Sequence, residues 1–193
     1  MAGSPPWRRW RSANVRHLSG LVGASGLAQI VTLGVSPFLT RLYTPQELGV
    51  YALVATGAAV FAPWATWGYH LAVILPEDDS EAVKIVRLAL AMTCATALLA
   101  GLVAMSVLLL PMALPELKGI GPQLVFVPVF VFIIGIVAAL LAYANRLREY
   151  RAMAQSTVTQ ATVQSATQVL GGVLQAGSGG MLFGQLAGGL AQV

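Results

Sequence analysis

A series of polar side chains within residues 152–176 forms the first group of candidate functional residues. Their spacing places them on one face of a helix whose opposite face is apolar. The members of this polar face are Thr157, Gln160, Gln164, Gln168 and Gln175. Because an amide both donates and accepts hydrogen bonds, such a face suits the hydroxyl groups of a carbohydrate in a polar cavity. The alternative is that it hydrogen-bonds a neighbouring helix, and the same two roles are open to Gln29 in an earlier apolar segment.

Arginines form the second group of candidate residues. Arg146, Arg148 and Arg151 stand between two apolar segments, where their ordinary role is to set membrane orientation and to contact anionic lipid. They could also hold a pyrophosphate group, because guanidinium groups match phosphate oxygens in pairs. Arg41 is isolated between two apolar segments, and for it an ion pair with Glu47 is favoured over ligand contact.

The groups that catalysis or metal binding would need are missing from the apolar segments. All seven acidic residues lie in polar breaks or at segment ends, so no carboxylate pair is placed inside the membrane. His17 and His70 are far apart in sequence, and Cys94 is the single cysteine. We therefore predict that the protein is not an enzyme, and we expect no cofactor, no metal and no nucleic-acid partner.

Composition indicates which elements must position these residues. Of the 193 residues, 57% are hydrophobic and 9% are charged, and the mean hydropathy is +0.77. A soluble domain carries roughly 25% charged residues, so this chain has too few to cover itself with a wetted surface. The solvent for most of the chain is therefore expected to be lipid, which makes it an all-α integral membrane protein.

The hydropathy pattern predicts a basic tail and six transmembrane helices. The tail covers residues 1–17, and the transmembrane unit covers residues 18–193, with short polar breaks between its apolar segments. The predicted helices are residues 18–40, 48–75, 85–110, 124–144, 152–176 and 181–193. Thirteen residues reach only about 20 Å, short of the ~30 Å hydrocarbon core, so we expect the sixth helix to be truncated and the chain to be a piece of a longer one.

Two local features refine this prediction. Pro63 lies near the middle of the second apolar segment, where proline predicts a kink. Trp64 and Trp67 follow it, and their expected role is an aromatic belt on the cytoplasmic side, with stacking on a sugar or gating as the alternative. The sequence GSGG at residues 177–180 is predicted to be the turn before the last helix.

The distribution of basic residues predicts the orientation. With the N-terminus inside, the inner segments carry nine lysines and arginines, whereas the outer breaks carry only Arg41 and Lys118. This asymmetry follows the positive-inside rule, so the N-terminus is predicted to be cytoplasmic.

Three stretches of the chain resemble a known family. Residues 36–53 read SPFLTRLYTPQELGVYAL, residues 145–154 read NRLREYRAMA, and residues 179–188 read GGMLFGQLAG. As a set they resemble the N-terminal half of the polysaccharide biosynthesis or O-antigen-type flippases of the multidrug/oligosaccharidyl-lipid/polysaccharide exporter superfamily. Gln46 stands where that family more often has an acid.

The resemblance implies a fold, a substrate and a location. Members of this family have about twelve to fourteen helices in two six-helix lobes, so this chain would be the first lobe of a two-lobe transporter. The implied substrate is a polyprenyl-pyrophosphate-linked oligosaccharide, which crosses the bacterial inner membrane by alternating access. Further implied partners are the lipid bilayer and a polysaccharide polymerase or export machinery.

Two other functions stay open beside the flippase. An exporter of small cations or drugs from the same superfamily would be expected to carry a carboxylate within these helices, and its absence disfavours that function. The other is a membrane partner of a polysaccharide assembly complex that transports nothing itself.

Overall fold

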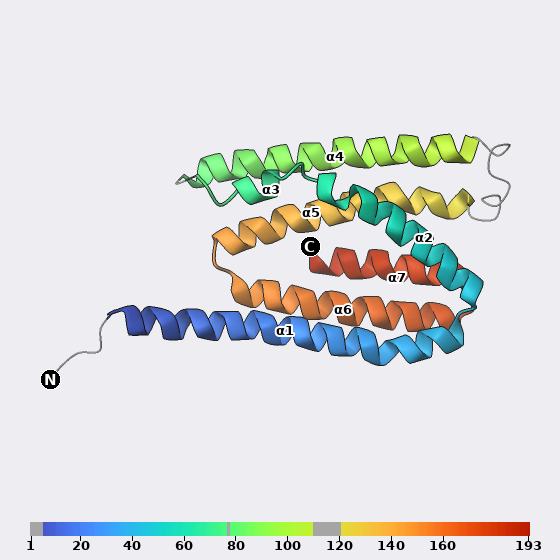
Figure 1. The fold of residues 1–193 in the computed structure, drawn as a ribbon, viewed down its shortest axis with the longest axis horizontal. Helices are drawn as coiled ribbons and strands as arrows, with labels where there is room; N and C mark the ends of the chain where they lie inside the picture. The colour runs from blue at the N-terminus through green and yellow to red at the C-terminus, as the bar shows by residue number, and fades with distance from the viewer. Residues whose placement is uncertain (1–5, 77, 110–120) are drawn as a thin grey trace.

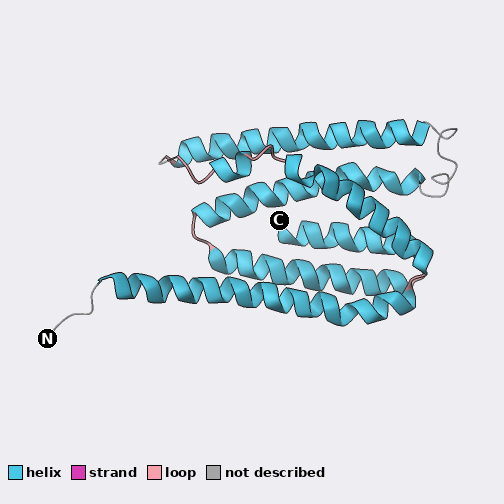
Figure 2. Cartoon of the chain, in the orientation of Figure 1, coloured by secondary structure: helices cyan, strands magenta, loops and turns pink. Residues whose placement is uncertain are grey.

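A computed structural model describes residues 6–76, 78–109 and 121–193 of the chain. These residues form α-helices and short 3-10 turns, and the described ranges contain no strand (Figure 2). The elements are α1 (Pro6–Leu42), α2 (Pro45–Phe61), η1 (Ala62–Trp64), α3 (Tyr69–Ala72), α4 (Asp79–Leu109), η3 (Gly121–Val125), α5 (Phe126–Arg146), α6 (Tyr150–Val173) and α7 (Gly177–Gln192). The predicted all-α class is therefore confirmed.

Four of these segments are long and apolar enough to cross a membrane. They are Gly20–Leu42, Pro45–Trp64, Asp79–Leu109 and Gly121–Arg146. Helix α6 is rich in glutamine and threonine, and α7 has only 16 residues, and neither is among the four. The structure thus supports a membrane protein with four apolar helices, while six spans remain a prediction.

The first helix begins earlier than its apolar segment. Helix α1 starts at Pro6, so residues 6–17, predicted as a tail, continue directly into the first apolar helix. Proline is well tolerated at a helix start, because the missing amide proton would have no helical partner there.

A tight corner joins α1 to α2. The Thr44 hydroxyl accepts a hydrogen bond from the backbone amide of Glu47, and the Glu47 carboxylate accepts one from the amide of Thr44. This capping box, with Pro45 in the first turn, starts α2 within three residues of the end of α1. The described residues show no ion pair between Glu47 and Arg41, because the carboxylate is used as the cap.

The second apolar segment is broken rather than kinked, which corrects the prediction of one helix over residues 48–75. Helix α2 ends at Phe61, and a 3-10 turn, Ala62–Trp64, follows it. Trp67 and Gly68 then take positive φ values of 50° and 78° before the short helix α3. Proline removes one helical hydrogen bond, and a left-handed glycine ends the helical path, so the two together stop the helix.

The last connection also differs from the prediction. The turn uses residues 174–176 and the left-handed Gly177, whose φ is 61°, while the rest of the GSGG sequence lies in the first turn of α7. Gln175 adopts the left-handed conformation, and the amide of Ala176 donates to the carbonyl oxygen of Gly171 across it. This pattern closes the C-terminus of α6 without needing a glycine at its tightest position.

The helices pack in two groups. Helix α6 lies between α1 and α7, and α4 lies along α5 (Figure 1). Helix α2 crosses from the first group to the second and contacts both α5 and α7. An apolar core joins α2, α4, α5 and α7, with Val54, Val131 and Leu182 fully buried.

Candidate functional site: a polar cluster between α2, α6 and α7

Small residues let α7 approach the polar face of α6. Gly184 and Gly188 lie against this face, and a Cβ atom added to Gly188 would be 2.7 Å from the Cβ of Gln164. At Gly184 an added Cβ would overlap the side chain of Gln168 and come within 3.0 Å of its backbone nitrogen. Glycine at these positions therefore sets the distance at which glutamine side chains of α6 reach α7.

Three side chains from three helices meet at one amide oxygen. The Oε1 of Gln185 on α7 accepts a hydrogen bond of 2.6 Å from the Nε2 of Gln164 on α6. The same oxygen accepts a bond of 2.9 Å from the hydroxyl of Tyr51 on α2. All three side chains are half-buried. Within the described ranges, the Nε2 of Gln185 and the Oε1 of Gln164 have no hydrogen-bond partner, so the cluster keeps one donor and one acceptor.

A second contact lies closer to the α1–α2 corner. The Tyr43 hydroxyl donates a hydrogen bond of 2.7 Å to the carbonyl oxygen of Gln168, and Tyr43 is only 4% exposed. Gln168 is 5% exposed and turns its Nε2 toward the carbonyl oxygen of Met181 at 3.5 Å. Burial raises the pKa of Tyr43, and the nearby Glu47 carboxylate raises this pKa further.

The tyrosine ring occupies a notch made by glycines. An added Cβ on Gly180 would lie 2.8 Å from the Tyr43 hydroxyl oxygen, and one on Gly172 would lie 3.0 Å from the Tyr43 Cε2 atom. Gly171 and Gly180 also approach one another closely. The corner between α1 and α2 therefore packs against the C-terminal end of α6 and the N-terminal end of α7.

Part of the predicted glutamine face thus forms hydrogen bonds between helices. Gln164 and Gln168 bond to α7, as the interhelical alternative describes, and Gln160 is half-buried on the same face with its carbonyl oxygen beneath Gly188. Gln175 is exposed in the turn after α6. Gln29 is exposed on α1, outside the hydrogen bonds of the cluster.

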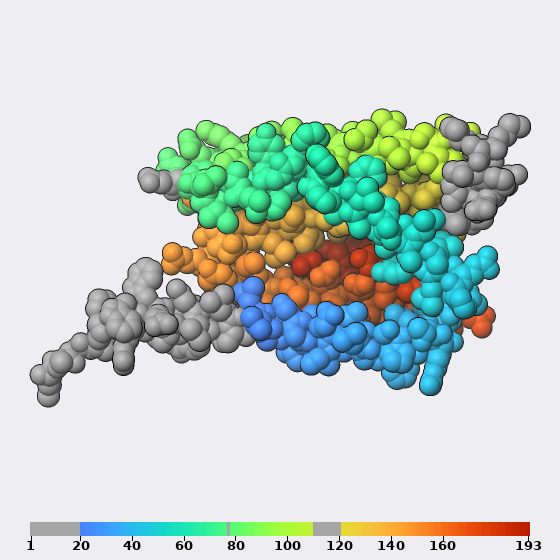
Figure 3. Space-filling view, viewed as in Figure 1, coloured from blue at the N-terminus to red at the C-terminus, as the bar shows by residue number. Residues whose placement is uncertain are grey.

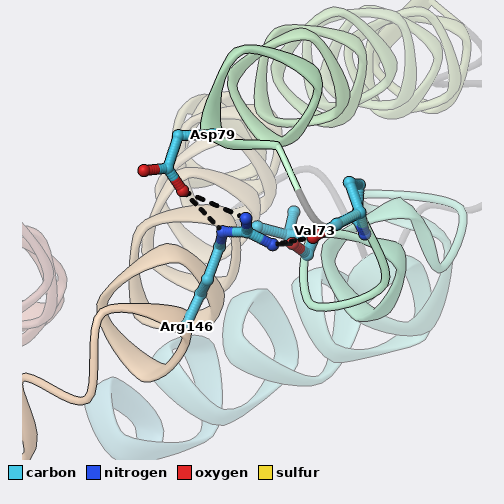
Figure 4. Close-up of polar contacts among 4 residues, drawn as sticks. Val73, Asp79 and Arg146 are labelled. Atoms are coloured by element: carbon cyan, nitrogen blue, oxygen red, sulfur yellow. Dashed lines mark hydrogen bonds and ion pairs between the residues drawn. The ribbon is translucent and has the colours of Figure 1, made fainter.

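The three clustered arginines have different environments. Arg146 is 12% exposed and donates from Nε and Nη2 to the Oδ1 of Asp79, at 3.3 and 3.0 Å. Its Nη1 donates to the carbonyl oxygens of Val73 and Pro76, so it ties the α3–α4 connection to the end of α5 (Figure 4). Arg146 thus has a structural role in this arrangement.

The other arginines on the candidate list are exposed. Arg148 has a φ of 58° in the left-handed turn that ends α5, and Arg151 lies in the first turn of α6. Arg41 is exposed at the end of α1, at the opposite end of the helices (Figure 1). Arg148 and Arg151 are therefore available for an anionic group, and Arg41 is separate from them.

Two members of the cluster were missed by sequence reasoning. Gln185 is a polar side chain within an apolar, glycine-rich segment, and that isolation was visible in the sequence. Tyr51 gave a weaker signal, because a tyrosine in an apolar helix is compatible with packing alone. Its role depends on the crossing of α2 over α7, which no local pattern reports.

Comparison of the chain with protein-family models, with curated proteins and with solved structures finds no match.

Proposed function

We propose that the chain moves a lipid-linked oligosaccharide across the bacterial inner membrane, as part of a flippase that works by alternating access. In this proposal α6 and α7 also cross the membrane, so that α1, α2, α4, α5, α6 and α7 form one six-helix lobe of a two-lobe transporter. The observation that carries the proposal is the cluster of Tyr51, Gln164 and Gln185, which joins three helices and keeps unused amide groups.

The chemistry of the cluster favours a neutral, hydroxyl-rich substrate. An amide nitrogen and an amide oxygen without partners can exchange hydrogen bonds with sugar hydroxyls, and neither group carries a charge that would have to be desolvated. In the described helices the acids lie in first turns, as Glu47, Asp79 and Glu81 do. A cationic substrate would lack a carboxylate partner inside this part of the lobe, which makes export of cations the weaker candidate.

Exposed arginines at one end of the lobe can bind the phosphate groups of such a substrate. Arg148 and Arg151 are exposed there, at the end of the bundle where α4 begins with Lys84 and Arg87 in its first turns (Figure 1). In our proposal this end faces the cytoplasm, and the two arginines receive the pyrophosphate as the substrate enters from the inner leaflet.

A reconstituted flipping assay tests the function. Vesicles containing the two-lobe transporter, with this chain as one lobe, and a fluorescent polyprenyl-pyrophosphate oligosaccharide are treated with dithionite, which bleaches only the outer leaflet. Wild-type protein is expected to let almost all fluorescence be bleached, and Gln185→Leu is expected to slow this by about tenfold, as the loss of roughly 1.4 kcal/mol of polar contact predicts.

Gln29→Leu is the matched control, because it removes an exposed amide from α1. Bleaching with wild-type protein that stops at half, as in empty vesicles, would contradict transport and favour the role of a non-transporting partner in an assembly complex. Equal bleaching rates for Gln185→Leu and wild-type protein would show that transport occurs but does not depend on the cluster.

A further inference from the structure

The break after α2 leaves two tryptophan side chains on the surface. Trp64 is 58% exposed and Trp67 is 59% exposed, and their rings meet edge to face with centroids 5.9 Å apart. The Nε1 of Trp67 donates to the hydroxyl oxygen of Thr96 at 3.1 Å, and that oxygen also lies 3.1 Å from the carbonyl oxygen of Trp64. The pair is therefore held in place by Thr96 on α4.

Thr96 places this pair inside the membrane rather than at its surface. It lies nine residues beyond Arg87, the last charged residue before the apolar part of α4. At ~1.5 Å per residue this is about 13 Å of helix, close to the middle of a ~30 Å hydrocarbon core. Figure 1 agrees, since α2 ends beside the middle of α4. An aromatic belt at the head groups, the predicted role of these tryptophans, does not fit this depth.

Non-helical backbone at this depth needs protein or water beside it. Peptide groups outside a helix cannot be left in hydrocarbon, and such breaks are tolerated only where they are buried in protein or line an aqueous cavity. Here Pro63, Trp64 and Trp67 are exposed, so the described chain does not cover them. The segment between α2 and α3 lies on the face toward the viewer in Figure 3. The positive φ of Trp67 is strained for a bulky residue, and such strain gathers at functional sites.

The outer face of α2 differs from that of α4. In the apolar part of α4 the exposed side chains are mostly large and aliphatic, such as Leu98, Leu99 and Leu102. On α2 the exposed residues that lead along the helix to Pro63 are mostly small, and they are Gly49, Ala52, Leu53, Thr56, Ala59 and Val60. A face of small residues that ends in two tryptophans leaves room for a bulky ligand beside the aromatic rings.

We infer that Trp64 and Trp67 form a stacking surface for a sugar ring of the transported glycan, an inference that rests on the proposed function. One side of a pyranose ring is a sheet of C–H groups that packs on an indole face, while its hydroxyls point outward to polar partners or water. The edge-to-face contact between the two indoles covers one face of one ring at most, and Thr96 holds Trp67 at the ring edge, so each exposed indole keeps at least one face for a sugar. A cation would gain from the same rings, but acids in the described helices lie at helix ends rather than beside this surface.

The first arm of the test asks what covers the tryptophans. Replacing Trp7 and Trp10 by phenylalanine leaves Trp64 and Trp67 as the only indoles of the chain. In lipid nanodiscs their fluorescence is expected to be quenched by water-soluble acrylamide and little affected by brominated lipid. Quenching by brominated lipid alone would overturn the inference, because the surface would then face hydrocarbon.

The second arm asks for the sugar. The two probes are a polyprenyl pyrophosphate carrying one N-acetylglucosamine and the same lipid without a sugar. Trp64→Leu is expected to bind the sugar-bearing probe about tenfold more weakly and the bare lipid unchanged, and Trp64→Phe is expected to keep much of the difference. The Trp64 side chain makes no hydrogen bond in the described structure, so this substitution leaves the bond from Thr96 to the backbone intact.

Phe38→Leu is the control, since it removes an equally exposed aromatic ring from α1. Equal loss for both probes, or no loss for either, would overturn the inference while wild-type flipping of the sugar-bearing probe keeps the proposed function. Failure of wild-type protein to flip that probe would count against the proposed function itself.

Discussion

Tyr43 shows how much one side chain can depend on its surroundings. In sequence it belongs to a short polar break, where a tyrosine would be expected at the membrane surface. In the structure it is buried in a notch of glycines and donates to a backbone carbonyl oxygen of α6. The hydroxyl needs that partner, because a buried donor without one would destabilise the fold by about 1–3 kcal/mol.

A pH prediction follows from the environment of this tyrosine. Because burial raises the native pKa above the ordinary value of about 10, the folded protein holds the phenolic proton more tightly than the unfolded chain. The contribution of Tyr43 is therefore complete below about pH 10 and declines as the pH rises through and beyond that value. Tyr43→Phe is expected to be less stable than wild type by about 1 kcal/mol at pH 8, with the gap shrinking above pH 10.

Unfolding midpoints of both proteins in one detergent, at pH 8, 9.5 and 11, measure this gap. The other tyrosines and the lysines are common to both proteins and cancel in the comparison. A gap that stays constant or widens with pH would show that the hydroxyl of Tyr43 is not held as a buried neutral donor.

At the scale of elements, the α6–α7 pair rests on close backbone approach. In lipid, apolar side chains gain little by leaving the solvent, so helices associate through tight packing and hydrogen bonds between them. Gly184 and Gly188 provide the approach, and Gln164, Gln168 and Gln185 provide the bonds.

Substituting alanine for glycine separates packing from helix propensity. Gly184→Ala is expected to lower stability by about 1–3 kcal/mol, because the new methyl group would overlap Gln168. Gly179→Ala in the same helix meets no atom within 4 Å and is expected to be neutral or stabilising by up to about 1 kcal/mol. Unfolding in mixed micelles gives both values, and equal behaviour of the two variants would contradict the close packing of α7 on α6.

At the scale of the whole molecule, successive long helices run in opposite directions, and most of the described basic residues lie at one end of the bundle. Lys84, Arg87, Arg148 and Arg151 lie at the end from which α1, α4 and α6 set out, and Arg41 lies at the other (Figure 1). The positive-inside rule therefore predicts that the first end faces the cytoplasm.

Cysteine labelling in intact cells tests that orientation. In a Cys94→Ala background, Arg41→Cys is expected to react with a membrane-impermeant maleimide added outside, and Arg151→Cys is expected to react only after the cells are opened. Both positions are exposed, so a difference between them reports their side of the membrane rather than burial. Labelling of Arg151→Cys alone in intact cells would reverse the proposed topology.

Much of the fold was open to prediction from local patterns. Low charge and long apolar segments predicted helices in lipid, and the α1–α2 corner was readable from Thr44, Pro45 and Glu47, because a capping box is made by neighbours in sequence. The break after Phe61 was only half predicted. Pro63 indicated a distortion, but the left-handed turn at Trp67 is held by Thr96, which lies far along the chain.

The candidate site was likewise only partly predictable from the sequence. The sequence by itself determined that the chain is helical and apolar and that glutamines share one face of a helix. It also determined that lysines and arginines are concentrated in the N-terminal tail and in alternate polar breaks. Only the tertiary structure decided which glutamines meet a partner, since Gln164 and Gln168 face α7 while Gln175 and Gln29 stay exposed. Helical periodicity gives the direction of a side chain about its own axis, but the crossing of α2 over α7 that brings Tyr51 to Gln185 depends on contacts between distant residues.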